Sequence, residues 1–99
     1  MTKRDLVVKI AKETGLIQSD VAEIVQQTLD NIAAELIAGN DIELRNFGVF
    51  EIKIRKSRKG RNPRDTSNEV IIPERAVVKF HAGKDLKEAV EKLDPSQFR

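Results

Sequence analysis

The sequence predicts a single α+β domain whose elements follow the order helix, helix, three strands, helix. Three observations predict this order. Apolar residues recur at helical spacing up to residue 40, the spacing changes to every second residue from Ile42, and helical spacing returns after Gly83. A length of 99 residues fits one domain. A lone chain of this size buries only about 60–65% of the surface that it exposes when unfolded, so an obligate oligomer is an open possibility.

The first helix is predicted to start at Thr2 and to end before Gly15. Thr2 with Asp5 three residues later is typical of a capped helix start. Gly15 suits the position after a helix, where the backbone often turns left-handed. The apolar residues between them follow helical spacing: Leu6, Val7, Ile10 and Ala11.

The second helix is longer and is predicted to end at Gly39 and Asn40. Ser19 or Asp20 is expected to cap its start, and Glu23 follows Asp20 by three residues. A wide apolar stripe covers about five turns and consists of Val21, Ile24, Val25, Leu29, Ile32, Ala33, Leu36 and Ile37.

Strands are predicted between residues 42 and 82. Ile42 and Leu44 form a short strand, and residues 46–48 form a turn, since Asn and Gly tolerate a positive φ. The next strand places Phe50, Ile52 and Ile54 on one face and Glu51, Lys53 and Arg55 on the other. Pro73 indicates a sheet edge or bulge, after which residues 76–80 resume a strand.

The last helix is predicted to open at Gly83 and to close at Asp94 and Pro95. Its apolar face consists of Leu86, Ala89, Val90 and Leu93. The predicted organisation is thus a helical base (residues 1–40), a sheet (41–82) and a C-terminal helix (83–94).

The segment between Ile54 and Val70 contains no apolar residue except one proline. A structureless loop of this length is unusual in a compact domain. We therefore predict a two-stranded ribbon that projects from the body at about residues 55–72, with limbs that reach roughly 25–30 Å. An isolated ribbon is marginal in water, which is the behaviour of a basic arm that orders on a polyanion.

Charge is distributed unevenly along the chain. Residues 1–50 carry 5 Lys or Arg and 8 Asp or Glu, whereas residues 51–99 carry 13 and 8, so the two halves have net charges of −3 and +5. The segment from Lys53 to Arg64, both ends included, contains seven basic residues and no acid. Such a run favours a polyanionic partner, most often nucleic acid, and the alternative is a solvated basic loop.

Several classes of protein are excluded by composition. The chain has no cysteine and only one histidine, His81, so disulfides, thiolate metal sites and histidine zinc clusters are not expected. No apolar run is long enough to span a membrane, and no signal-peptide pattern follows the N-terminus, so we expect a soluble intracellular protein. No catalytic set or phosphate loop is present, so neither an enzyme nor a cofactor is expected. With four Phe and no Trp or Tyr, stacking on single-stranded bases is disfavoured.

The predicted tip of the ribbon carries Arg61, Asn62, Pro63 and Arg64. Arginine suits a narrow anionic groove, and a two-stranded ribbon fits a groove of duplex DNA. Pro63 is rigid and apolar and has no core to join, so it suits a wedge between base pairs. The alternative is a proline that only shapes the turn.

From Thr2 to Val90 the chain resembles the bacterial HU and integration host factor family. The resemblance is carried by residues 60–63 (Gly-Arg-Asn-Pro), by 47–50 (Phe-Gly-Val-Phe), and by 83–86 (Gly-Lys-Asp-Leu) after Phe80, with Thr2 and Lys3 as a weaker match. It implies an intertwined homodimer or heterodimer with a helical base, a three-stranded saddle and two arms. It also implies a protein of the bacterial nucleoid whose arms enter the minor groove of double-stranded DNA, bend it by intercalating Pro63, and compact it or assist nucleoprotein assembly.

The resemblance assigns roles to individual residues. The residues that it implies for DNA contact are Lys3, Arg45, Lys53, Arg55, Lys56, Arg58, Lys59, Arg61, Asn62, Pro63, Arg64, Arg75, Lys79, Gly83 and Lys84. Those that we expect in the dimer core are Leu29, Leu36, Leu44, Phe47, Phe50 and Phe80, for which an ordinary monomer core is the alternative. His81 is expected at the surface near phosphate and is assigned no chemistry.

The chain departs from the family pattern at three places. Residues 64–68 (Arg-Asp-Thr-Ser-Asn) are one residue longer than the usual segment and lack its glycine, which bears on the geometry of the kink. Ala82 stands where the family usually has proline, and Asn46 where it often has glycine.

Two other kinds of nucleic-acid-binding protein share some of these features. A helix-turn-helix around Gly15 is disfavoured, because the second helix carries four acids (Asp20, Glu23, Asp30 and Glu35) and no Lys or Arg. A basic-arm RNA-binding or ribosome-associated protein remains the alternative, and competition between DNA and RNA duplexes distinguishes the two.

Overall fold

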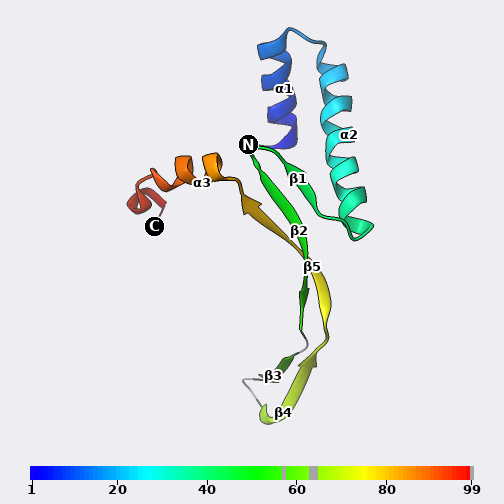
Figure 1. Ribbon diagram of the computed structural model, residues 1–99, viewed down its shortest axis with the longest axis vertical. Coiled ribbons are helices and arrows are strands. Elements are labelled where there is room, and N and C mark those ends of the chain that lie inside the picture. The colour runs from blue at the N-terminus through cyan, green and yellow to red at the C-terminus, as the bar shows by residue number, and fades with distance from the viewer. Residues whose placement is uncertain (57, 63–64, 99) are drawn as a thin grey trace. The chain divides into compact units, whose positions relative to one another are not determined.

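The computed structural model describes residues 1–56, 58–62 and 65–98, and it describes side chains outside residues 57–72 (Figure 1). The chain forms two compact units, Met1–Ala38 and Gly39–Arg99. The first is helical, and the second contains all the strands and the last helix. This is the α+β order that the sequence predicts.

The first unit is a hairpin of two helices, α1 (Lys3–Thr14) and α2 (Gln18–Ile37), which lie side by side (Figure 1). The predicted capping box is confirmed: the Asp5 N–H donates to Thr2 Oγ1 at 3.2 Å, and the Thr2 N–H donates to Asp5 Oδ2 at 2.9 Å. Gly15 has a φ of 72°, and its N–H donates to the Ala11 carbonyl at 2.9 Å. The end of α1 is therefore a left-handed glycine, as predicted.

The predicted cap of α2 is wrong. The N-cap residue is Ile17, which makes no side-chain cap, and the helix includes Ser19 and Asp20 in its first turn. After the left-handed Gly15 only two residues connect the helices, so the chain enters α2 before it reaches a capping side chain. Asp20 still favours the helix start, since its charge lies near the positive end of the helix dipole.

The second unit contains an antiparallel sheet of three strands, β1 (Ile42–Leu44), β2 (Gly48–Arg55) and β5 (Arg75–Ala82), in the order β1-β2-β5. Because alternate residues face opposite sides, the register separates an apolar face from a charged face. The apolar face pairs Phe50 with Phe80, Ile52 with Val78, and Ile54 with Ala76. The alternation predicted for residues 50–55 is confirmed.

The turn between β1 and β2 uses its small residues in two different ways. Asn46 has a φ of 67°, as the turn prediction requires. Gly48 does not have a positive φ, so its role is different from the predicted one. A Cβ atom on Gly48 would lie 2.6 Å from the His81 carbonyl oxygen and from the Phe80 ring. A glycine is required there because the neighbouring strand approaches closely.

The predicted ribbon is present as a separate two-stranded sheet of β3 (Arg58–Asn62) and β4 (Asp65–Ile72). It begins at Arg58 rather than near residue 55, because β2 continues to Arg55 and stays paired with β5. The pairing is regular from Arg58 with Ile72 to Arg61 with Glu69, and then shifts, so that Asn62 pairs with Asp65. This irregularity falls in the segment where the sequence departs from the family pattern.

The C-terminal part consists of α3 (Lys84–Glu91) and a short 3-10 helix at Pro95–Phe98. Gly83 is the N-cap of α3, as predicted, whereas the helix ends three residues before the predicted Asp94. Asp94 instead starts the 3-10 turn. Its carboxylate accepts from the Ser96 N–H at 3.0 Å and from Ser96 Oγ at 2.9 Å, and these bonds lower the pKa of Asp94.

A single copy of the chain encloses little apolar material. Among the residues whose side chains the structure describes, only Val7 and Val21 are buried hydrophobic side chains. Leu29 on α2 is 46% exposed and Phe80 on the sheet is 41% exposed. Within the described ranges, none of the helices combines the length and apolar character needed to cross a membrane.

Candidate nucleic-acid interface

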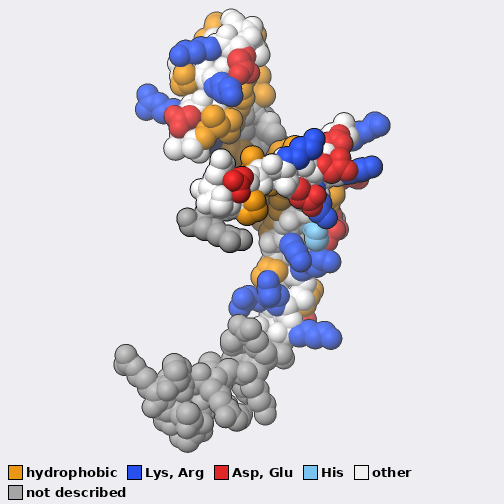
Figure 2. Space-filling view, turned by 90° about the vertical axis from the view of Figure 1, so that its left-hand side faces the viewer, with side chains coloured by type: hydrophobic (Ala, Val, Ile, Leu, Met, Phe, Trp, Pro, Cys, Tyr) orange, Lys and Arg blue, Asp and Glu red, His pale blue; other side chains and the backbone are white. Residues whose placement is uncertain are grey.

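The charged face of the three-stranded sheet gathers four of the predicted DNA-contact residues. Arg55 lies opposite Arg75, Lys53 opposite Val77, and Lys79 opposite Glu51. Lys53, Arg55, Arg75 and Lys79, which we call the basic face, line a hollow of about 620 Å³. Figure 2 shows Lys and Arg side chains gathered along this part of the molecule. The two strands thus bring together cations that are twenty or more residues apart in the sequence.

Glu51 is an acidic residue on this charged surface that contacts two of its neighbours. Its Oε2 atom lies 3.2 Å from Lys53 Nζ and 3.3 Å from His81 Nε2. The pale-blue histidine in Figure 2 lies beside acidic side chains. Sequence reasoning placed His81 at the surface but missed its carboxylate partner. The available signal was the strand period, because His81 is two residues from Lys79 and so shares its face.

The turn that carries Arg45 lies against the start of α3. The Gly83 N–H donates to the Phe47 carbonyl at 2.7 Å, and a Cβ atom on Gly83 would lie 3.1 Å from that carbonyl group. The structure therefore brings together two regions predicted to bind DNA, the Arg45 turn and Gly83 with Lys84. No side chain in the described part of the chain caps α3, so its first N–H groups can meet an anion.

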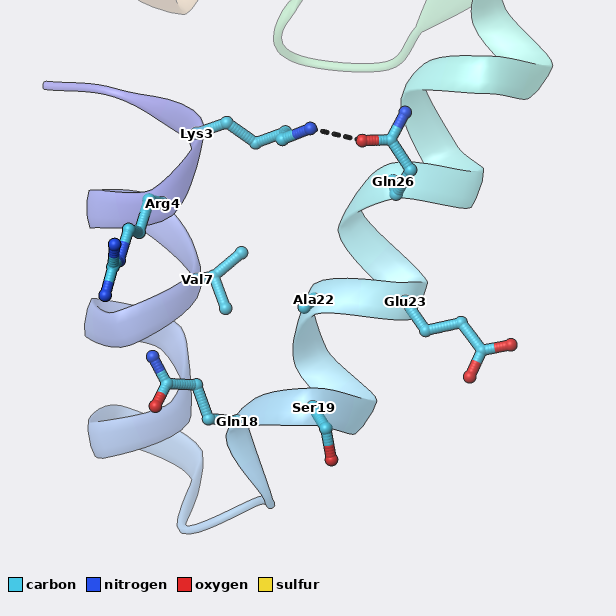
Figure 3. Close-up of a pocket in the computed structure, with 8 residues that line it drawn as sticks. All are labelled: Lys3, Arg4, Val7, Gln18, Ser19, Ala22, Glu23 and Gln26. Carbon is cyan, nitrogen blue, oxygen red and sulfur yellow. Dashed lines mark hydrogen bonds between the residues drawn. The ribbon is translucent and has the colours of Figure 1, made fainter.

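Lys3 belongs to the helical unit rather than to the sheet unit. Its Nζ donates to Gln26 Oε1 across the mouth of a hollow of about 690 Å³ between α1 and α2, which has Val7 and Ala22 in its wall (Figure 3). The amide contact holds the ammonium group at the start of α1 without neutralising its charge, so the charge stays available to a phosphate.

The remaining predicted contacts lie in or near the ribbon. Lys56 follows β2, and β3 contains Arg58, Lys59, Arg61 and Asn62, whose side chains lie outside the described part. Pro63 and Arg64 lie outside the described residues. The roles predicted for the arm therefore remain predictions.

The residues predicted for the dimer core fall into two groups. Phe80 contacts both other rings on the sheet unit: its centroid is 4.8 Å from that of Phe50 and 5.6 Å from that of Phe47. Leu44 belongs to the same sheet, opposite Gly48. Leu29 and Leu36 lie on α2 in the helical unit. The three rings gather on the sheet unit, and Phe47 and Phe80 remain partly exposed in one copy. Their role in a dimer core stays a prediction.

Comparison with known proteins shows the family to which the chain belongs. The family model described as bacterial DNA-binding protein matches residues 1–91. DNA-binding protein HRL18 of Rhizobium leguminosarum is 46% identical over 90 residues, which cover 91% of this chain and 98% of that protein. Integration host factor subunit alpha of Methylococcus capsulatus is 41% identical over 98 residues, covering 99% of this chain and 88% of that one.

Solved structures agree with the sequence relatives. The HU chain in an Anabaena HU–DNA cocrystal structure is 32% identical and superposes with a TM-score of 0.83, covering 94% of this chain and all of that one. An HU mutant from Thermotoga maritima is 31% identical with a TM-score of 0.67, covering 91% of this chain and 99% of that one. The chain therefore belongs to the bacterial DNA-binding protein family of HU and integration host factor.

Proposed function

We propose that this protein is a dimeric architectural protein that binds and bends double-stranded DNA in the bacterial cytoplasm. The observation that carries the proposal is the basic face, a set of four cations on the two strands that are continued, along the chain, by the basic ribbon. Phosphate contacts from such a surface provide affinity without sequence preference. Family membership and the likeness to an HU chain crystallised with DNA support the same assignment.

The position of the aromatic rings supports a duplex rather than a single strand as the ligand. Phe47, Phe50 and Phe80 form one cluster, and Phe50 and Phe80 lie on the apolar face of the sheet, opposite the basic face. Binding of single strands usually relies on rings that stack with bases inside the charged groove. Among the described side chains, the basic face offers charge and no Phe ring, which suits the sugar–phosphate backbone of a duplex.

Dimerisation accounts for the exposed apolar surface. The sheet exposes Ile54, Val78 and Phe80, and α2 exposes Ile24 and Leu29. Burial of apolar surface contributes about 25 cal/mol per Å², so a partner that covers these side chains stabilises the fold substantially. The partner is a second copy of this chain or a paralogue with the same apolar pattern.

The bend is assigned to the arm tip at residues 61–64. The pairing shifts from Arg61 with Glu69 to Asn62 with Asp65, which supports a tip at this point of the ribbon, next to Pro63 in the sequence. Apolar wedges of minor-groove binders, HU and integration host factor among them, unstack a base step and kink the duplex by about 20–90°. A bend of this kind serves compaction of DNA or the assembly of nucleoprotein complexes.

Ring closure of short DNA tests the proposal. DNA has a persistence length of about 150 bp, so ligase rarely closes a fragment of about 100 bp. We expect the protein to promote closure of such a fragment strongly. Binding that leaves closure unchanged would show a protein that neutralises phosphates without bending, and equal or tighter binding to duplex RNA would favour the RNA-binding alternative.

A further inference from the structure

One carboxylate oxygen on the charged face serves two partners. Glu51 Oε2 contacts Lys53 Nζ at 3.2 Å and His81 Nε2 at 3.3 Å. Of the four cations of the basic face, Lys53 is the one with an ion pair among the described residues. The three side chains are partly exposed, 30% for Glu51, 52% for Lys53 and 43% for His81, so both contacts can break and re-form.

The two contacts respond differently to pH. Lys53 stays charged throughout the physiological range, whereas imidazole is the side chain that changes charge between about pH 5 and 8. A neutral imidazole offers Glu51 at most one N–H donor, but an imidazolium offers a full positive charge. Protonation of His81 therefore gives Glu51 a cation that can replace Lys53.

We propose that Glu51 competes with DNA phosphate for Lys53, and that protonation of His81 releases Lys53 by taking over Glu51. This inference rests on the proposed function, because it concerns how the same basic face engages phosphate. Its consequence is that DNA binding strengthens as the pH falls. Glu51 and His81 are thus positioning residues that set how many cations the face presents.

The charges around His81 determine the sign of this effect. On β2, Glu51 and Lys53 face the imidazole, and Val49 lies directly opposite it. On β1, Glu43 pairs with Val49 and shares the face, and Lys79 precedes His81 by two residues on its own strand. Two carboxylates and two lysines thus share this face with His81. Bound phosphates add negative charge, so DNA binding takes up a proton at His81, and by linkage the affinity rises as the pH falls.

The test measures the affinity of the protein for one DNA duplex at about pH 7.0 and at about pH 5.5, with ionic strength held constant. His81 is the only histidine in the chain, and ordinary carboxyl and terminal amino groups titrate mostly outside this interval, so a pH response reports mainly on His81. We expect binding to be about two- to fivefold tighter at the lower pH, the range typical of one partly exposed ion pair. The same experiment by calorimetry in two buffers of different ionisation enthalpy should show proton uptake on binding.

Two variants separate the residues. His81→Gln should remove the pH response and keep the affinity measured at neutral pH. Glu51→Gln should bind more tightly at both pH values and lose most of the pH response, because Lys53 is then free throughout. Glu43→Gln is the matched control, since it removes the same charge from the same face without touching Lys53, and it should keep the response. Circular dichroism verifies that each variant is folded.

Three results would overturn the inference: a pH response that survives His81→Gln, one that survives at full size in Glu51→Gln, or no response in the unmodified protein. The second would mean that imidazolium contacts phosphate directly. Tight DNA binding without a pH response would leave the proposed function intact, whereas absence of DNA binding at neutral pH would count against the proposed function itself.

Discussion

Arg55 and Arg75 lie directly opposite each other in the β2–β5 register. Like charges at opposed positions of a sheet destabilise it, so this pair does not serve the stability of the isolated fold. Two guanidinium groups on neighbouring strands can instead share one phosphate or hold two successive phosphates. The pair lies where β2 and β5 leave the three-stranded sheet, next to the ribbon in sequence.

Replacement of either arginine should weaken DNA binding without harming the fold. Arg55→Ala and Arg75→Ala should each lower the slope of log K against log salt by about 0.9 for each phosphate that the variant no longer neutralises, because fewer counterions are released on binding. Anisotropy titrations at salt concentrations from about 50 to 200 mM measure this slope. Lys87→Ala on α3 removes an exposed charge outside the predicted contacts and serves as the control. An unchanged slope in both arginine variants would show that the basic face does not touch phosphate.

Gly48 should tolerate a methyl group less well than Gly83. A Cβ atom at Gly48 would lie 2.6 Å from the His81 carbonyl and the Phe80 ring, whereas at Gly83 the nearest atoms are 3.1 Å away. Neither glycine has a positive φ, so the contacts decide the difference. Gly48→Ala should lower the free energy of unfolding by about 1–3 kcal/mol, as overpacking does. Chemical denaturation at fixed protein concentration measures both variants, and an equal effect of the two substitutions would contradict the close approach of β5.

The apolar stripe of α2 should be a dimer interface. Leu29→Lys should lower the free energy of unfolding by about 2–3 kcal/mol per protomer from the missing apolar burial alone. It should therefore shift the protein toward unfolded monomer. Gln27→Lys, an exposed position on the same helix, should have little effect. Sedimentation equilibrium and the dependence of the melting temperature on protein concentration follow the change. A melting temperature independent of concentration in the unmodified protein would contradict dimerisation.

Pro63→Ala should separate bending from binding. The variant keeps every basic residue of the arm, so its affinity for linear duplex DNA and its salt dependence should stay close to those of the unmodified protein. It removes the rigid wedge, so ring closure of a fragment of about 100 bp should fall to a small fraction of the original rate. Pro73→Ala, at the other end of β4, is the control. Undiminished ring closure in Pro63→Ala would refute the wedge.

The sequence predicts most of the fold because the spacing of its apolar residues changes clearly from one segment to the next. The stripe from Val21 to Ile37 is too regular for anything but a helix, and the alternation from Phe50 to Arg55 assigns each side chain to a face. The predicted start of α2 is wrong because a good capping residue, Ser19, stands two residues after the actual N-cap. Capping propensity favours Ser19 over Ile17, but the short connection after Gly15 places the start of the helix before Ser19.

The sequence identifies the cations of the site, but it does not show how these cations are arranged in space. That Arg55 meets Arg75 depends on the register of two strands separated by the ribbon, and no local pattern sets that register. The same holds for Glu51 with His81, whose contact is diagonal across β2 and β5. The close approach at Gly48 likewise comes from β5, more than thirty residues further along the chain.

The most direct test of the central claim, that this protein stabilises bent DNA, compares its affinity for four duplexes of equal length over a series of salt concentrations. The duplexes are intact DNA, DNA with a nick or gap, DNA with an A-tract, and RNA. A nick lowers the energy needed to deform the duplex, so a protein that bends DNA should bind nicked DNA most tightly, RNA most weakly, and all DNA with a steep salt dependence. Equal affinity for all four duplexes would mean that the arms respond to charge alone, and the bending account would be wrong.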